Sequence, residues 1–65
     1  MENNLKKIRL KKKITQQKLA NNIEVSISQI ANIENNRSIP SVEIAIKIAQ
    51  TLDCIVEEIF YIKKE

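Results

Sequence analysis

Residues 16–35 read QQKLANNIEVSISQIANIEN, and their apolar spacing is typical of two short helices that meet at a tight corner. Ser26 is a good N-cap for the second helix, and Gln29, three residues later, completes a capping box. The residues expected on the inner faces are Leu19, Ala20 and Ile23 in the first helix, Val25 at the corner, and Ile30 and Ile33 in the second helix.

The outer face of the second helix is predicted to carry mostly short polar side chains. The residues expected on this face are Ile27, Ser28, Gln29, Asn32 and Asn36, of which all but Ile27 are polar. An exposed helix of this kind beside a basic surface suits the major groove of DNA.

Charge is distributed unevenly along the 65 residues. The net charge is +3, but residues 1–40 hold eight Lys or Arg against three acids, whereas residues 41–65 hold three against five. Positive charge in the part that carries the helix pair indicates a polyanionic partner. In the basic run KKIRLKKK (6–13), a solvated helix face is the simplest interpretation, and attraction to phosphates by Lys11 to Lys13, near the start of the next helix, is the functional one. Binding to a membrane surface is a third, but it needs a stronger apolar face than Leu5, Ile8 and Leu10 provide.

Composition argues against several other classes of protein. With one cysteine and no histidine, disulfide frameworks and most zinc sites are excluded, and no catalytic constellation is present. Cys54 is expected to be a small buried apolar residue. The apolar runs are too short for a membrane span. We therefore expect a cytoplasmic, nucleoid-associated protein that is not an enzyme and has no cofactor, no metal, no membrane contact and no small-molecule ligand.

The rest of the chain extends the helical pattern to an all-α domain over residues 1–65. Helices are predicted at about 4–12, from Thr15 as N-cap to about 22, from Ser26 as N-cap to about 35, from Pro40 and Ser41 onward, and at about 55–60. The inner face of the fourth helix is predicted at Val42, Ala45, Ala49 and Leu52. The tail YIKKE is expected to form a strand or to fray.

Glycine is absent, although helix corners often need a residue with positive φ. The corners are predicted near Lys13, Glu24, Asn36 and Asp53. Asn and Asp tolerate this conformation, so strain of about 1 kcal/mol per corner is expected at Lys13 and Glu24.

Several motifs together resemble the Cro/CI-type helix-turn-helix family, also called XRE or lambda-repressor-like. They are T-Q-x-x-L-A, V-S-x-S-x-I, I-E-N, P-S and L-x-x-x-x-E-E-I-F, within Leu5 to Phe60. The resemblance implies a compact five-helix fold with the helix-turn-helix at helices 2 and 3, in a short single-domain regulator. The chain departs from the family at the corners without glycine and at Ile55, where a capping Ser or Thr is common.

The resemblance also implies site residues. Base contacts fall on Ile27, Ser28 and Asn32, with Gln29 alongside; phosphate contacts fall on Thr15, Gln16, Asn35, Asn36 and Arg37. Asn and Gln can pair with adenine, and an isoleucine can pack on a thymine methyl, which weakly favours A·T-rich half-sites. The simpler interpretation is that any exposed helix carries such residues. The family often links Arg9 and Glu34 by a structural ion pair.

The C-terminal part holds more apolar residues than a small core needs, notably Ile44, Ile46, Ile55, Tyr61 and Ile62. We expect a homodimer with Ile55, Tyr61 and Ile62 in its interface. Such a dimer would place two recognition helices about 34 Å apart on a palindrome.

The leading functional hypothesis is a sequence-specific regulator of transcription that binds double-stranded DNA, most simply a repressor. An antitoxin-like or other protein-interaction module is the alternative, and an inert helical scaffold is a third. Steep loss of DNA binding with rising salt would distinguish a regulator from a scaffold.

Overall fold

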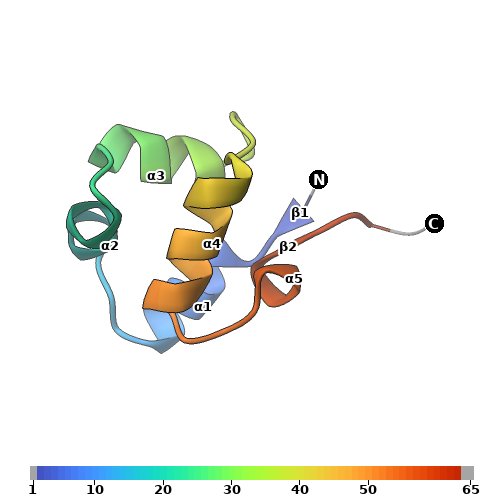
Figure 1. Ribbon diagram of the computed structural model, residues 1–65, viewed down its shortest axis with the longest axis horizontal. Helices are drawn as coiled ribbons and strands as arrows, with labels where there is room; N and C mark the ends of the chain where they lie inside the picture. The colour runs from blue at the N-terminus through green and yellow to red at the C-terminus, as the bar shows by residue number, and fades with distance from the viewer. Residues whose placement is uncertain (1, 64–65) are drawn as a thin grey trace.

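Five helices and two short strands make up residues 2–63, the part of the chain that the computed structural model describes (Figure 1). In order they are β1 (Glu2–Asn3), α1 (Leu5–Lys11), α2 (Gln16–Ile23), α3 (Ile27–Glu34), α4 (Val42–Thr51), α5 (Val56–Ile59) and β2 (Phe60–Tyr61). Helices α2 and α3 lie on one side, α5 and the strands lie on the other, and α4 stands between them (Figure 1). The predicted five-helix all-α fold is confirmed.

The strands form a small antiparallel sheet, in which Glu2 pairs with Tyr61 and Asn3 with Phe60. Of the C-terminal tail expected to form a strand or to fray, only Tyr61 belongs to β2; Ile62 and Lys63 are in no strand, and the last two residues lie outside the described residues. No sequence pattern indicates β1, because two residues are too short to show the alternation of a strand. The amide of Asn4 extends the pairing by donating to the carbonyl of Ile59 at 2.8 Å.

One core holds the helices together, and each of the five helices contributes one of the largest fully buried side chains. Leu52, which directly follows α4, adds a sixth. They are Leu5, Leu19, Ile30, Ile48, Leu52 and Ile59. The inner faces predicted for α2 and α3 are buried as expected.

The prediction that Val42 lies on the inner face of α4 is wrong, because its side chain is 78% exposed. Ile48 is fully buried instead. At 3.6 residues per turn, Ala45, Ile48 and Ala49 form one stripe, and Val42 lies beside Ile46 at its edge. The first turn of α4 therefore contributes an apolar edge to the surface rather than a residue to the core.

The four predicted corners are confirmed as positive-φ residues. Lys13, Glu24 and Asn36 each have φ of 59°, and Asp53 has φ of 54°. Glu24 is the C-cap of α2, and its amide and that of Val25 donate to the carbonyls of Asn21 and Ala20. A left-handed turn without glycine therefore sets the angle between α2 and α3.

A buried ion pair fixes α1 to the end of α3. The Nε atom of Arg9 donates to Oε2 of Glu34 at 2.6 Å, and its Nη2 atom donates to Oε1 at 3.3 Å. The two side chains are only 7% and 3% exposed. The Nη1 atom donates to the carbonyl of Ile14 at 2.9 Å, so the guanidinium also holds the connection between α1 and α2.

Replacement of Glu24 by glycine should stabilise the domain. Glycine adopts positive φ without the steric penalty of a Cβ atom, so we expect the free energy of unfolding to rise by about 1 kcal/mol. Urea unfolding followed by circular dichroism would measure it. Glu24→Ala is the matched control and should give no such gain, because alanine keeps the Cβ atom; an equal gain would assign the effect to the lost charge.

Separating the ion pair should be far more damaging than replacing both partners. Arg9→Met or Glu34→Met alone leaves one buried charge without its partner, at a cost of about 3–5 kcal/mol. The double variant removes both charges and should recover at least half of that loss. Urea unfolding of the three variants tests this, and single-variant losses below about 1 kcal/mol would show that the pair is not effectively desolvated.

Candidate nucleic-acid interface

The helix α3 begins with a reciprocal cap that fixes its first turn. The amide of Gln29 donates to Oγ of Ser26 at 3.1 Å, and the amide of Ser26 donates to Oε1 of Gln29 at 3.1 Å. This is the capping box predicted from the sequence. Because Val25, just before the cap, packs against the core, the start of α3 is held from both sides.

The predicted base-contacting residues lie together on α3 but differ in exposure. Ile27 is 42% exposed, Ser28 and Gln29 are also exposed, and Asn32 is half-buried. Ile27, Ser28 and Gln29 all lie in the first turn, so the exposed part of this face is at the start of the helix. Asn32 lies more than one turn further on, and its carbonyl accepts from the amide of Arg37 at 2.8 Å.

The cap restricts what Gln29 can do. Pairing with adenine would use its Oε1 atom as acceptor and its Nε2 atom as donor. In this structure Oε1 is already bonded to the amide of Ser26, which leaves Nε2 as the group that can donate outward. In a bidentate contact with a base, Oε1 would have to accept from the base and from the Ser26 amide together, which its two lone pairs permit.

Two predicted phosphate-contacting residues lie at the start of α2. Thr15 is the N-cap, and its Oγ1 atom accepts from the amide of Lys18 at 3.0 Å. Gln16 is the first residue of the helix, and its Nε2 atom donates to Oε1 of Glu34 at 2.9 Å. The ion-paired carboxylate therefore connects α1, the start of α2 and the end of α3.

Three more of the predicted residues follow α3 directly: Asn35, Asn36 and Arg37 are consecutive and exposed. Asn35 is the C-cap of α3, and Asn36 has the left-handed conformation that turns the chain. The side chain of Asn36 is not entirely free, because its Oδ1 atom accepts from Nδ2 of Asn3 at 2.7 Å.

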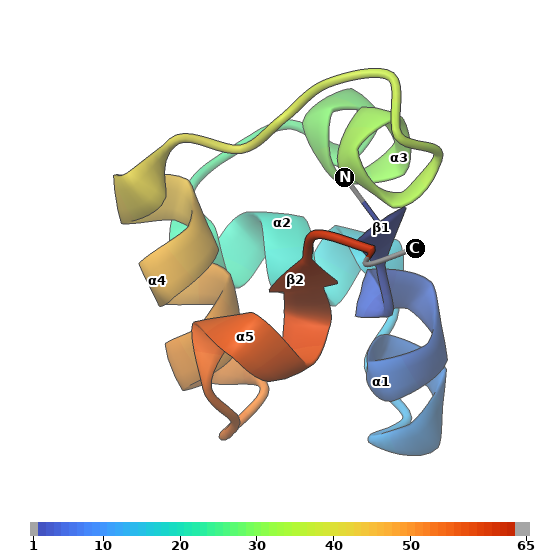
Figure 2. The same ribbon diagram turned by 90° about the vertical axis from the view of Figure 1, so that its right-hand side faces the viewer.

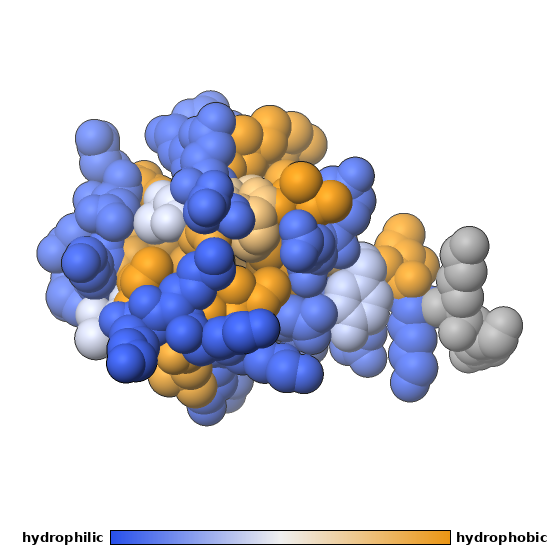
Figure 3. Space-filling model, turned by 90° about the horizontal axis from the view of Figure 1, so that it is seen from below, coloured by the Kyte–Doolittle hydropathy of each residue, from blue (hydrophilic) through white to orange (hydrophobic). Residues whose placement is uncertain are grey.

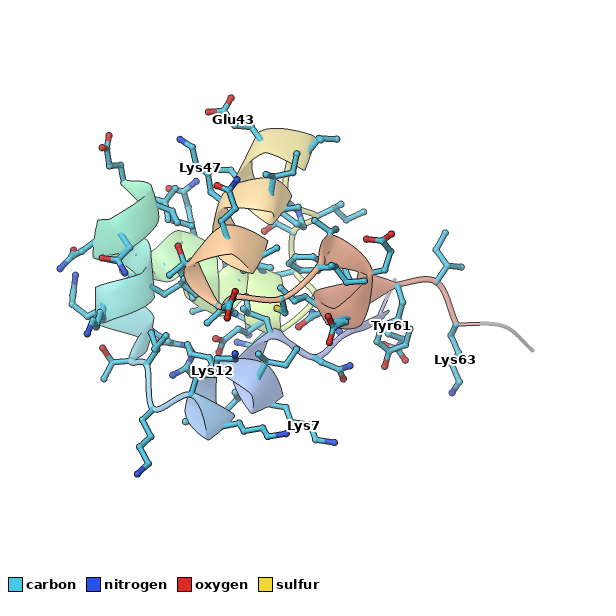
Figure 4. All side chains as sticks on the ribbon, turned by 60° about the horizontal axis from the view of Figure 1, so that its bottom comes forward. Lys7, Lys12, Glu43, Lys47, Tyr61 and Lys63 are labelled. Atoms are coloured by element: carbon cyan, nitrogen blue, oxygen red, sulfur yellow. The ribbon has the colours of Figure 1, made fainter. Side chains whose placement is uncertain are left out.

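The basic run is spread along α1 and the connection that follows it. Lys13 lies in this connection, where it has a left-handed backbone conformation. Lys7 extends from α1 into solvent (Figure 4). Lys12 lines a shallow pocket with Cys54 and Glu58, toward the acidic C-terminal part. The structure thus distributes Lys7, Lys12 and Lys13 over α1 and the connection to α2.

Cys54 is half-buried at the corner after α4. Burial, followed by the charge of Glu58, raises the pKa of its thiol, so the thiol is protonated and weakly nucleophilic at neutral pH. Within residues 2–63 no group of three or more His, Cys, Asp or Glu side chains is placed to hold a metal ion. No helix in that range combines the length and apolar character needed to cross a membrane.

An apolar groove of about 500 Å³ lies between α4 and β2. The exposed apolar residues that line it are Ile39, Val42, Ile46, Tyr61 and Ile62. Two of the predicted interface residues, Tyr61 and Ile62, belong to it, whereas Ile55 is 59% exposed but outside the lining. From below, apolar atoms show between the hydrophilic side chains and again on the C-terminal extension (Figure 3).

Sequence interpretation missed Ile39 and Val42 as part of this groove. Ile39 directly precedes Pro40 in the connection between α3 and α4, where polar residues are usual. An isoleucine in such a connection is a sign in the sequence that the residue contacts an apolar surface. On the same helix, Glu43 and Lys47 form an ion pair of 3.2 Å and lie side by side (Figure 4).

Comparison with known proteins agrees with this arrangement. A family described as Helix-turn-helix matches residues 5–59, which include all five helices. The chain is also 29% identical, over all 65 of its residues and 98% of the relative, to the uncharacterized HTH-type transcriptional regulator YgzD of Bacillus subtilis (strain 168). With a capped, exposed α3 set against α2 and a family match over most of its length, the chain belongs to the Cro/CI-type helix-turn-helix family.

Proposed function

We propose that this protein is a sequence-specific, double-stranded-DNA-binding regulator of transcription that places α3 in the major groove. The observation that carries the proposal is the immobilised and exposed start of α3, where Ile27 and Ser28 follow a complete capping box. Polar groups flank it, at Thr15 before α2 and at Asn35 to Arg37 after α3. This order of phosphate-binding and base-contacting groups is typical of helix-turn-helix proteins.

Base recognition in this proposal is shared unequally among the α3 residues. Ile27 would pack against a thymine methyl, and Ser28 would donate to or accept from a base edge. Asn32 would contact adenine from the middle of the helix. Gln29 would contribute mainly through its Nε2 donor, because its oxygen serves the cap.

We further propose that the regulator is a homodimeric repressor that binds a palindromic operator. The apolar groove supports this, since Val42, Tyr61 and Ile62 expose apolar surface around it. Its lining comes from α4, α5 and β2, and β2 lies on the side of α4 away from α2 (Figure 1), so occupation by a second copy would leave α3 free for DNA. Ile55 would lie at the margin of such an interface.

Selection of bound sequences from a random duplex pool at near-physiological salt tests this function. Enrichment of a palindrome with half-sites about 10 base pairs apart would support both specific binding and a two-fold dimer. A folded protein that enriches no sequence would refute it, and the groove would then favour the alternative, an antitoxin-like module that binds a partner protein.

Substitutions on α3 and in the following turn should affect binding differently. Asn32→Ala removes a base contact, so the selected sequence should become less defined while affinity for random duplexes changes less than about two-fold. Arg37→Ala removes a phosphate contact and should weaken all duplexes alike, with a salt dependence reduced by about one counterion. Fluorescence anisotropy across salt concentrations measures both. If Asn32→Ala lowers the affinity for all duplexes equally, Asn32 does not contact a base. If Arg37→Ala lowers the affinity only for duplexes changed at one operator base, Arg37 contacts that base rather than a phosphate.

A charge in the apolar groove should oppose dimer formation. Ile62 is 82% exposed, so Ile62→Asp should leave folding intact while placing an unpaired charge in the proposed interface. We expect a shift toward monomer in analytical ultracentrifugation. Leu10→Asp, at a residue 57% exposed on α1, is the matched control and should leave the assembly unchanged. If wild type and Ile62→Asp sediment equally, Ile62 is not part of a dimer interface.

A further inference from the structure

The strand β1 contacts the end of the recognition helix through one side chain. The Nδ2 atom of Asn3 donates to the carbonyl of Ile33 at 2.9 Å and to Oδ1 of Asn36 at 2.7 Å. Its Oδ1 atom accepts from the amide of Leu5 at 3.1 Å. Figure 2 shows β1 below the end of α3. One amide therefore joins the small sheet, the start of α1 and the turn after α3.

These partners determine which way each amide faces. A backbone amide can only donate and a backbone carbonyl can only accept, so Leu5 and Ile33 fix the orientation of the Asn3 side chain. The amino group of Asn3 can only donate, and Asn36 must therefore turn its Oδ1 atom toward it. The Nδ2 group of Asn36, on the other branch of the same planar amide, is turned away from Asn3 on an exposed residue.

That orientation matters because phosphate oxygens only accept hydrogen bonds. We propose that Asn3 is a positioning residue for DNA binding, which holds the Asn36 amide with its Nδ2 donor toward a backbone phosphate beside Arg37. The inference rests on the proposed DNA-binding function and adds to it a residue far from α3 in the sequence. Asn3 itself touches no DNA in this arrangement.

Among residues 2–63, the bond from Asn3 is the one hydrogen bond that holds the side-chain amide of Asn36. The terminal torsion of asparagine is broad and nearly two-fold, so a released amide would present its oxygen to the phosphate for part of the time. Binding would then include the entropy cost of ordering the Asn36 amide. With Asn3 present, the amide is already ordered before DNA binds.

A double-mutant cycle between Asn3 and Asn36 tests the proposal. Asn3→Ser retains an acceptor for the amide of Leu5 but lacks the amino group that reaches Asn36. Asn36→Gly keeps the left-handed turn and removes the amide. The readout is the dissociation constant for one duplex of random sequence at constant salt, with urea unfolding of each variant as the stability check.

Asn3→Ser should weaken binding by about three-fold in the wild-type background and leave it unchanged in the Asn36→Gly background. Asn36→Asp, which turns a carboxylate oxygen outward, should weaken binding by more than Asn36→Gly does. The matched control is Asn4→Ser: Asn4 donates to the carbonyl of Glu58 at 3.2 Å and does not reach Asn36, so this variant should keep wild-type affinity.

Equal weakening by Asn3→Ser in both backgrounds would overturn the proposal, because it would show that Asn3 acts through the stability of the strand. No weakening in either background would also overturn it. A folded wild-type protein that binds no duplex would instead refute the proposed function and the inference with it, an outcome distinct from a failed cycle.

Discussion

Burial of the Arg9 guanidinium is the constraint on which the arrangement of α1, α2 and α3 depends. A charge in the interior must be paired and hydrogen-bonded, and here Glu34 and the carbonyl of Ile14 meet that requirement. Glu34 also accepts from Gln16, so three helices can be rearranged only by exposing an unpaired charge. The pair adds little net stability by itself, but it makes alternative angles between these helices costly.

Local chemistry made the helix-turn-helix predictable from the sequence. Capping needs only a side chain and the next few amides, so Thr15 and Ser26 marked helix starts correctly. The corner at Glu24 was predictable because the apolar spacing changes phase there, although glutamate rarely adopts positive φ. Capping and apolar spacing depend on residues that are close in sequence, so packing against the rest of the fold did not alter the predicted starts of α2 and α3.

Features that depend on distant residues could not be predicted in this way. The exposure of Val42 and the burial of Ile48 depend on which stripe of α4 meets the other helices. The bond between Asn3 and Asn36 joins residues 33 positions apart, and nothing in either local sequence indicates it. The likeness to a known family supplied the Arg9–Glu34 pair, which spacing alone would not have shown.

The β1–β2 pair closes almost the whole chain into one loop, since Glu2 faces Tyr61, while consisting of only two residues on each side. Closing a longer loop costs more conformational entropy, and few hydrogen bonds offset that cost here. Elements of this kind are the first to open in native-state fluctuations. Opening of this sheet would release the turn after α3 and one wall of the apolar groove in a single event, and it would loosen Phe60, which β2 contributes to the core. This two-residue sheet is thus shared by the two candidate binding surfaces.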